Sequence, residues 1–464
     1  MGASYFICIA AAISSMFSSR LPRYDVRFPN VVIIPGTITL CVIITTLFAF
    51  KTTIVNTAAH TLAHPPPYID HLPLRTIRNN AYENEIQEPL AITLETISII
   101  QTSALFALAF LLRVNSRHTK TQYFVNVILA ATALILTITA LHASSIESED
   151  IYLHVGLAEA TPTPYHPGST PLSGDSAVIN LIWGLPLFPS AYGPLWIILS
   201  KIVTMPLTTL AHKLFALRCL EAAALMLCAM FLCVLKLPCW TIAIFAVNPT
   251  IYDLFVSEGH NDLVGTTFIL AASAVRRKSL AGAILLTVAA GMIKLPFILI
   301  GSLVFAAEST LFRRAAPVFA AAGISLVLSF VMAGSWYAWA LRYAVHAYEP
   351  LDSIDTVLHT LLIAIAVGAL FLAVARQKFI PGAAWSMPAF GLFLLPWYLA
   401  WSLPYALLSP RPNLIFLATL PIAAYLFNVG NAMTSFFILL RVACVAVPIV
   451  LIVIALLRRR HEPV

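Results

Sequence analysis

The sequence predicts an all-α polytopic membrane protein, and three observations lead to that fold class. Of its 464 residues, 60% are hydrophobic and only 10% are charged, whereas about 25% of a typical soluble domain is charged. The mean hydropathy is +0.90. The apolar runs are long and continuous, unlike the short alternating segments of a membrane β-barrel. A soluble enzyme, a disordered chain and a nucleic-acid reader are therefore excluded, and helices remain as the structure that satisfies the backbone in lipid.

The apolar runs predict the number of membrane-spanning helices. A spanning helix needs roughly 20 apolar residues, and fewer where its ends are buried by neighbours. The runs predict a bundle of about 14 transmembrane helices on this criterion. The expected spans are residues 32–50, 91–113, 121–143, 217–235, 238–256, 262–275, 279–292, 295–310, 315–335, 355–375, 382–396, 400–410, 413–428 and 435–457.

The basic residues predict the orientation. If Arg458, Arg459 and Arg460 lie in the cytoplasm, the alternation of spans places most of the 27 Lys and Arg residues inside and most of the 20 acids outside, as the positive-inside rule requires. Residues 192–206 break this alternation, so we expect a juxtamembrane or re-entrant helix on the outer face. The chain is then expected in the plasma membrane, with its C-terminus cytoplasmic and its active site extracytoplasmic.

The order of runs and loops suggests three segments. Residues 1–120 are expected to form N-terminal transmembrane helices and an outer loop. Residues 121–335 would form a catalytic core that includes the first large outer loop, 144–216. Residues 336–464 would form C-terminal transmembrane helices.

An acidic cluster follows the expected span 121–143. It contains Glu147, Glu149 and Asp150. Repulsion and partial desolvation raise a carboxyl pKa, so one of these acids is a candidate general base. The alternative is a solvated run of charges in a loop.

A second polar cluster, Gly259-His260-Asn261-Asp262, lies between two short apolar runs. An ionisable residue at membrane depth is costly and therefore suggests a function. His260 can donate to a phosphate or a leaving oxygen, and Asp262 can orient or charge it. Asn261 or Asp262 can instead cap the following helix, and the two interpretations are compatible.

Few basic residues lie on the expected outer side. Lys294, Arg342 and Arg441 are candidate partners of a lipid-linked phosphate, which needs cationic donors. Snorkelling to lipid head groups is the alternative for each. Arg218 has Glu221 one turn on, a pair that could be purely structural.

Aromatic residues at the expected outer surface could stack on a sugar. These are Tyr192, in Tyr192-Gly193-Pro194-Leu195-Trp196, and Trp397 and Tyr398, in a run interrupted by prolines. An interfacial aromatic belt explains them equally well.

A divalent metal is an open question at the sequence level. Glu149, Asp150, His260 and Asp262 could hold Mg²⁺ or Mn²⁺ if they converge, because hard carboxylate ligands suit these ions. A separation of Asp150 and His260 above about 15 Å would contradict a single reacting centre.

Six short motifs follow one another between about residue 145 and residue 410. They are Glu149-Asp150-Ile151-Tyr152, Thr163-Pro164-Tyr165, Tyr192-Gly193-Pro194-Leu195-Trp196, Gly259-His260-Asn261-Asp262, Lys294-Leu295-Pro296 and Pro396-Trp397-Tyr398. Together and in this order, they resemble the polyprenol-phosphate-mannose-dependent mannosyltransferases. More narrowly, they resemble the α-1,6-mannosyltransferases of actinobacterial lipoglycan assembly, which belong to the C-type (GT-C) membrane glycosyltransferases.

The resemblance implies a fold and a mechanism. The fold would be a GT-C-like bundle with outer-face loops and juxtamembrane helices. The donor would be a sugar on a polyprenyl monophosphate, and the acceptor a hydroxyl of a lipid-linked or glycan molecule. Asp150, assisted by Glu149, would deprotonate that hydroxyl, and the sugar would be displaced with inversion. His260, Asn261 and Asp262 would bind the donor.

Other functions stay open at this stage. A flippase or transporter of polyprenyl-linked sugars is the non-enzyme alternative, although a transporter should place ionisable residues at the midplane of broken helices. Mannose rests on the resemblance alone, and arabinose, glucose or galactose donors would need similar pockets.

Overall fold

A computed structural model of the chain describes residues 30–62, 83–114, 119–143, 150–183, 186–306, 308, 310–346, 396–408 and 414–432. The described part is mostly helical, as the sequence predicts. The only strands in it are β1 (Pro162–Thr163) and β2 (His166–Pro167), which form an antiparallel hairpin.

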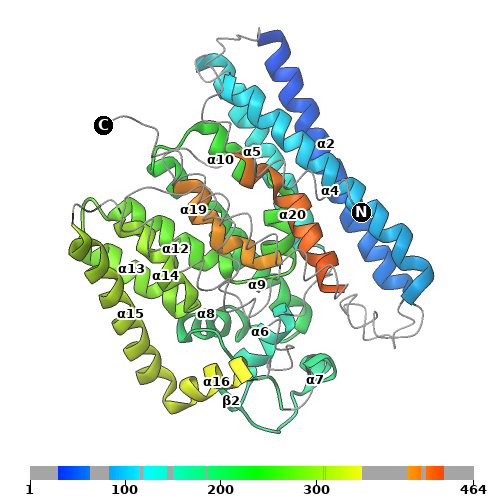
Figure 1. Cartoon of the computed structure of the whole chain (residues 1–464). Coiled ribbons are helices and arrows are strands. Elements are labelled where there is room, and N and C mark those ends of the chain that lie inside the picture. The colour runs from blue at the N-terminus through cyan, green and yellow to red at the C-terminus, as the bar shows by residue number, and fades with distance from the viewer. Residues whose placement is uncertain are drawn as a thin grey trace.

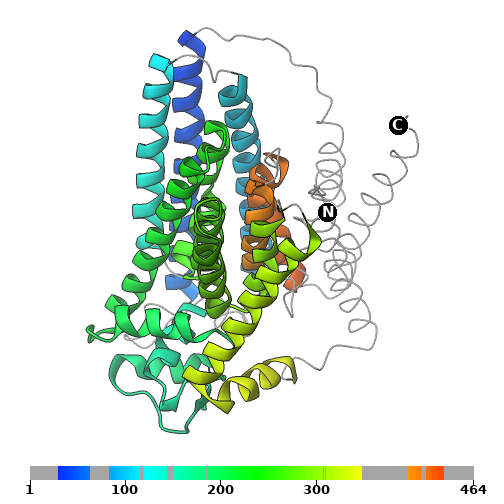
Figure 2. The ribbon, with the colours of Figure 1, turned by 90° about the vertical axis from the view of Figure 1, so that its left-hand side faces the viewer.

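Long helices form one flank of the molecule. The helix α2 (Asn30–Leu62) packs against α4 (Glu83–Val114) and α5 (Thr119–Leu141). The three run side by side in Figure 2. Lys51 of α2 forms an ion pair with Asp253 and so connects this flank to the rest of the bundle.

The remaining helices build the centre and the opposite flank (Figure 1). The helix α12 packs against α9, α13 and α14, and α15 covers α13 and α14. Their bounds are α9 (Leu210–Val234), α10 (Cys239–Ala246), α11 (Pro249–Ile251), the π-helix η3 (Tyr252–Ser257), α12 (Asp262–Val275), α13 (Leu280–Ile293), α14 (Pro296–Phe305), α15 (Leu311–Ala333), α16 (Ser335–His346), η5 (Pro396–Ser402), α19 (Leu403–Leu408) and α20 (Leu414–Ala432).

Five helices of the described part are long and apolar enough to cross a membrane. They lie in α2, α4, α5, α9 and α15. The count becomes six if one bent pair of helices is a single span. The expected count of about 14 is not confirmed, because several expected spans are short helices of 10 to 14 residues. The expected spans 355–375 and 435–457 lie outside the described residues, and so does the expected span 382–396 except for its last residue.

The expected span 238–256 is broken. The helix α10 and the segment Pro249–Ser257 meet at an angle of 49°. Pro249 supplies no amide hydrogen to continue the helix, and the side chain of Asn248 caps the new helix by accepting from the Thr250 amide. The break follows from this Asn-Pro step.

The expected outer loop 144–216 is largely folded. It contains α6 (Asp150–Glu159), the β1–β2 hairpin, the short helix η2 (Gly174–Ser176), α7 (Ala177–Trp183) and α8 (Pro194–Thr204). The helix α8 occupies the expected juxtamembrane segment 192–206, and Pro194 begins it. These elements gather at one end of the bundle, together with α16 (Figures 1 and 2). The division into three segments, 1–120, 121–335 and 336–464, stays a prediction.

Gly193 allows α8 to meet the end of α13. Its amide donates to the carbonyl oxygen of Ile293 at 2.9 Å. A Cβ atom at position 193 would lie 2.1 Å from the carbonyl oxygen of Met292. Only glycine fits this backbone contact, which brings the neighbouring Tyr192 and Lys294 together.

We therefore expect Gly193→Ala to destabilise the protein. The new methyl group forces two backbone segments apart, and overpacking of this kind costs about 1–3 kcal/mol. The measurement is the thermal unfolding midpoint of the purified protein in detergent. Gly323→Ala is the matched control, because it lies in α15 with no heavy atom within 4 Å of its added Cβ. Equal unfolding midpoints for the two variants would contradict the packing argument.

Candidate active site

Asp150 lies where three elements meet. It is the first residue of α6, where a negative charge is favoured by the helix dipole. The Tyr192 hydroxyl donates to Oδ2 of Asp150 at 3.2 Å. Nδ1 of His260 lies 3.4 Å from the same oxygen. The motifs of Asp150 and His260, more than 100 residues apart in the sequence, thus meet at one carboxylate oxygen, far inside the 15 Å limit.

A glycine explains how His260 reaches α6. Gly259 has a φ of 69°, in the left-handed region that glycine adopts at little cost. A Cβ atom there would lie 2.6 Å from Cδ1 of Ile151. The turn that carries His260 therefore packs directly on the first turn of α6.

His154 lies one turn along α6 from Asp150, and the sequence analysis missed it. Its ring is buried against Tyr192 and Trp196, with ring centroids 4.8 and 4.9 Å apart. Nε1 of Trp196 donates to Nδ1 of His154 at 3.1 Å, while Nε2 has no hydrogen-bond partner in the described part of the chain. The i,i+4 spacing from Asp150 is the signal that could have found it.

Asp262 forms the second centre of the site. It is fully buried, and Nζ of Lys294 donates to its two carboxylate oxygens at 3.0 and 3.2 Å. Nε1 of Trp401 donates to Oδ1 at 2.5 Å. The sequence predicted Asp262 and Lys294 but not Trp401, whose approach from η5 depends on the tertiary fold.

The break between α13 and α14 presents Lys294 to the site. Lys294 is in an extended conformation directly after α13, and Pro296 begins α14 two residues later. The break in the helical path falls at Lys294 itself, because Leu295, directly before Pro296, is already helical. The lysine therefore leaves the helix axis and reaches Asp262.

Lys294 connects the two centres. Its ammonium lies 5.4 Å from the ring centroid of Tyr192 and 5.3 Å from that of Trp401, within the range of a cation–π contact. Tyr192 in turn binds Asp150. The predicted residues Asp150, Tyr192, His260, Asp262 and Lys294 thus form one continuous site, which we call the Asp150–Lys294 site.

The charge state of Asp150 differs from the sequence prediction. Burial raises its pKa, but the hydrogen bond from His260 and the charges of His260, His154 and Lys294 outweigh burial. The pKa of Asp150 is therefore lowered, and the expected raised pKa is wrong for this residue. The stabilising groups come from distant parts of the sequence, so local repulsion does not decide the outcome.

Burial dominates at His154. It lowers the pKa of the imidazole to about 3, with Asp150 acting in the opposite direction. The ordinary value is about 6.5, so His154 is neutral at physiological pH. A neutral His154 accepts from Trp196 without adding a positive charge to the site.

This lowered pKa predicts that the protein loses stability in mild acid. Between about pH 6.5 and pH 3 the unfolded chain binds a proton at His154 that the folded chain does not, so stability falls as the pH decreases. Asp150 acts in the same direction only below its ordinary pKa of about 3.9. We expect the unfolding midpoint of the wild type to decrease from pH 7 to pH 5, and that of His154→Asn to decrease less. Parallel curves for the two proteins would contradict this origin of the pH dependence.

Asn261 and Glu221 add buried polar atoms near this site. Asn261 precedes α12 at its cap position without a side-chain capping bond, and its Nδ2 is buried without a partner among the described residues. Both carboxyl oxygens of the buried Glu221 also lack a partner there. The suggested pair with Arg218 is therefore not formed, and Arg218 donates to the Ser257 carbonyl at 3.0 Å instead.

Other predicted site residues are not brought into the Asp150–Lys294 site. Arg342 is exposed on α16, whose tryptophans contact His166 of the hairpin. Trp397 and Tyr398 belong to η5, but their side chains lie outside those described. Glu149 and Arg441 lie outside the described residues altogether.

The described residues that the sequence suggested as metal ligands, Asp150, His260 and Asp262, do not all point to one place. Asp150 and His260 do converge, but Asp262 is occupied by Lys294 and Trp401. Within the described ranges, no three His, Cys, Asp or Glu side chains are grouped as they would be around a metal ion.

The Asp262–Lys294 pair predicts a measurable stability effect. Lys294→Met leaves a buried carboxylate without its cation, which costs about 3–5 kcal/mol. We expect a lower unfolding midpoint in detergent and partial recovery in the double variant Lys294→Met/Asp262→Asn. Lys201→Met, on the exposed surface of α8, is the control and should leave the midpoint unchanged. No recovery in the double variant would contradict the role assigned to the buried charge.

The fold and the site define a class: a helical membrane protein with paired acid, imidazole and ammonium groups near one end of its bundle. Residues 73–309 match a protein-family model described as alpha-(1->6)-mannopyranosyltransferase, N-terminal domain. The chain belongs to this family. The matched range contains Asp150, His260, Asp262 and Lys294, and it confirms the resemblance found in the sequence. No curated protein and no solved structure gives a match. Family membership supports mannosyltransferase activity, and therefore glycosyl transfer. The long apolar helices support a location in a membrane.

Proposed function

We propose that this protein transfers mannose from a polyprenyl-phosphate donor to a hydroxyl of a lipid-linked or glycan acceptor. Asp150 acts as the general base, and the reaction inverts the anomeric configuration. The reaction takes place at the extracytoplasmic face of the plasma membrane. Two parts of this proposal go beyond the mannosyltransferase activity of the family. They are the polyprenyl-phosphate donor and the activation of the acceptor by Asp150.

One observation carries the proposal. The Asp150 carboxylate lies within 3.4 Å of an imidazole. Tyr192 connects it to a lysine that is held by a second carboxylate. A displacement at an anomeric carbon needs a base on one side and stabilisation of a leaving phosphate on the other. The Asp150–Lys294 site offers both within one cluster.

The acceptor oxygen forms a bond to the anomeric carbon of the donor as its proton passes to Asp150. The bond from the anomeric carbon to the phosphate oxygen breaks, and polyprenyl phosphate leaves with that electron pair. Because the attacking and leaving oxygens lie on opposite faces of the sugar, the configuration inverts. Asp150 then releases its proton to water.

Three residues near Asp150 and Asp262 could donate hydrogen bonds to the leaving phosphate. An ammonium carries three N–H donors, so Lys294 can bind a phosphate while it remains paired with Asp262. The buried Nδ2 of Asn261 can donate, and His260 can donate when protonated. Tyr192, which contacts both Asp150 and Lys294, would contact the sugar between them.

Removal of the base predicts a large loss of turnover. Asp150→Asn keeps the size of the side chain but cannot accept the proton at neutral pH, and general-base catalysis contributes about 10²–10⁴-fold. We expect such a decrease in kcat for mannosyl transfer from synthetic polyprenyl-phosphate mannose by the purified protein. The KM for the donor should change little. Asp175→Asn, an exposed aspartate in η2, is the matched control.

Three results would overturn the proposal in different ways. Equal turnover by Asp150→Asn and the wild type would remove Asp150 from the mechanism. Turnover by the wild type with arabinose, glucose or galactose donors, and not with a mannose donor, would contradict mannose as the transferred sugar. Movement of the intact donor across proteoliposomes without cleavage would indicate a flippase.

A further inference from the structure

Two neighbouring helix turns carry basic residues at the end of the bundle away from the Asp150–Lys294 site. The helix α12 begins at Asp262 and α13 ends beside Lys294, so the turn between them lies at the far ends of both helices. The helix α14 begins at Pro296 and also runs away from the site, which places the turn between α14 and α15 at that same end. The charged residues of these turns, which we call the basic end, are Arg276, Arg277, Lys278, Glu308, Arg313 and Arg314.

Contacts through Glu308 hold the two turns together. Nη1 of Arg276 lies 3.5 Å from Oε1 of Glu308, and Nε of Arg314 donates to the Glu308 carbonyl oxygen at 2.5 Å. The side chains of Ser279 and Thr310 cap the helices that follow the turns. The basic end is therefore one formed surface built from both turns.

Three cations of the basic end have no acidic partner in the described part of the chain. Arg277, Lys278 and Arg313 are exposed, and none of them forms an ion pair within the described ranges. The one acid of the two turns, Glu308, already faces Arg276. Five positive charges against one negative charge leave the basic end with a net charge of +4. Like charges so arranged repel each other, and a bound anion relieves the repulsion.

Helix stability does not explain these positive charges. They stand around the N-terminal ends of α13 and α15, where the helix dipole favours acids and disfavours cations. Neither helix has an acid in its first turn. The backbone amides at both helix starts add to the positive potential of the exposed side chains, and together they favour a phosphate group.

Exposed apolar residues stand directly beside the cations. Leu280 begins α13, and Leu311 and Phe312 begin α15. They are 50%, 52% and 78% exposed. The helix α15 is long and apolar enough to cross a membrane, so its first turn lies where head groups and acyl chains meet. A soluble anion would use only the cations of the basic end, whereas a phospholipid uses the apolar residues as well.

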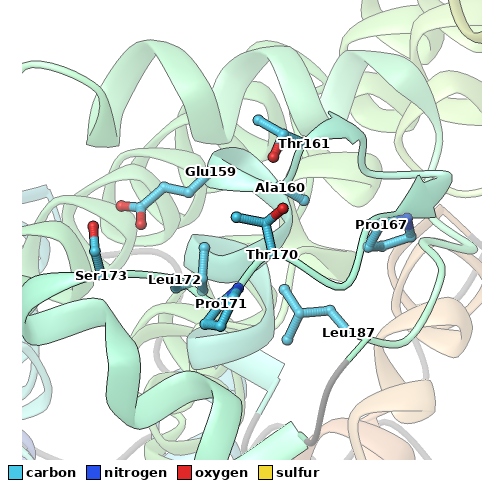
Figure 3. A pocket seen from close by; sticks show the side chains of 10 residues that line it. Glu159, Ala160, Thr161, Pro167, Thr170, Pro171, Leu172, Ser173 and Leu187 are labelled. Carbon is cyan, nitrogen blue, oxygen red and sulfur yellow. The ribbon is translucent and has the colours of Figure 1, made fainter.

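The pocket at the end of α6 is a poorer place for an anion. Figure 3 shows the Glu159 carboxylate among its lining side chains, and the other lining residues are uncharged. This carboxylate forms an ion pair with Lys213. The pair leaves no excess of positive charge at the pocket, in contrast to the basic end.

We propose that the basic end binds an anionic phospholipid. Arg277, Lys278 and Arg313 donate hydrogen bonds to the phosphate oxygens of the head group. The acyl chains lie against Leu311 and Phe312. A head group with two phosphates is preferred over one with a single phosphate, because several cations are available to it. The bound lipid joins the two turns and stabilises the helices that carry Asp262 and Lys294, and this role does not depend on the proposed function.

The test measures stabilisation by added lipid. The unfolding midpoint of the delipidated, full-length protein is recorded in detergent alone and with cardiolipin, phosphatidylglycerol or phosphatidylcholine. We expect the midpoint to rise with cardiolipin, less with phosphatidylglycerol and not with phosphatidylcholine, because a ligand of the folded state stabilises it. The variant Arg277→Gln/Lys278→Gln/Arg313→Gln should lose most of the rise. Lys278→Gln alone should lose part of it, and the matched control Lys201→Gln, exposed on α8, should lose none.

Two further measurements separate charge from folding and lipid from free phosphate. Arg277→Lys/Arg313→Lys keeps both charges and should keep most of the rise, which excludes a folding defect as the cause of the loss in the Gln variant. Inorganic pyrophosphate carries two phosphates without acyl chains and should give no rise at the same concentration. The proposal is overturned by no rise of the wild-type midpoint with cardiolipin, by an equal rise with phosphatidylcholine or pyrophosphate, or by an unchanged response of the triple Gln variant.

Discussion

The burial of Asp262 is the constraint on which the rest of the site depends. A fully buried carboxylate is tolerated only if a cation and hydrogen-bond donors accompany it. Lys294 and Trp401 supply these from the α13–α14 break and from η5. Once Lys294 is held there, its ammonium lies against Tyr192 and contributes to the lowered pKa of Asp150. The acid that orients the lysine therefore also adds, through that lysine, to the lowering of the Asp150 pKa, in which His260 has the larger part.

Two glycines make this convergence sterically feasible. Gly193 lets α8 approach the carbonyl end of α13, and Gly259 lets the turn that carries His260 pack on Ile151. Each contact brings two sequence motifs together, because Tyr192 lies directly before Gly193 and His260 directly after Gly259. In these two motifs, the glycine positions the polar residue beside it.

Much of the fold and part of the site could be predicted from the sequence. Long apolar runs identified α4, α5 and α15, because membrane burial depends mainly on local composition. Asp150, His260 and Lys294 were identifiable as rare polar residues between apolar runs. The role of Trp401, the burial of His154 and the lowered pKa of Asp150 were not, because each depends on contacts between distant segments. Within residues 144–216, α8 matches the expected juxtamembrane helix, but α6, α7 and the break at Pro249 were not predicted, because apolar runs alone do not identify them.

The central claim is that the Asp150–Lys294 site holds the reacting end of the lipid donor. The most direct measurement is a cryo-electron microscopy map of the full-length protein in nanodiscs with a bound polyprenyl monophosphate. The account predicts phosphate oxygens at hydrogen-bond distance, about 3 Å, from Nζ of Lys294. Between the phosphate and Asp150 it predicts space for the sugar that the donor carries. A phosphate bound at Arg342 or elsewhere, with the Asp150–Lys294 site closed to it, would contradict the account.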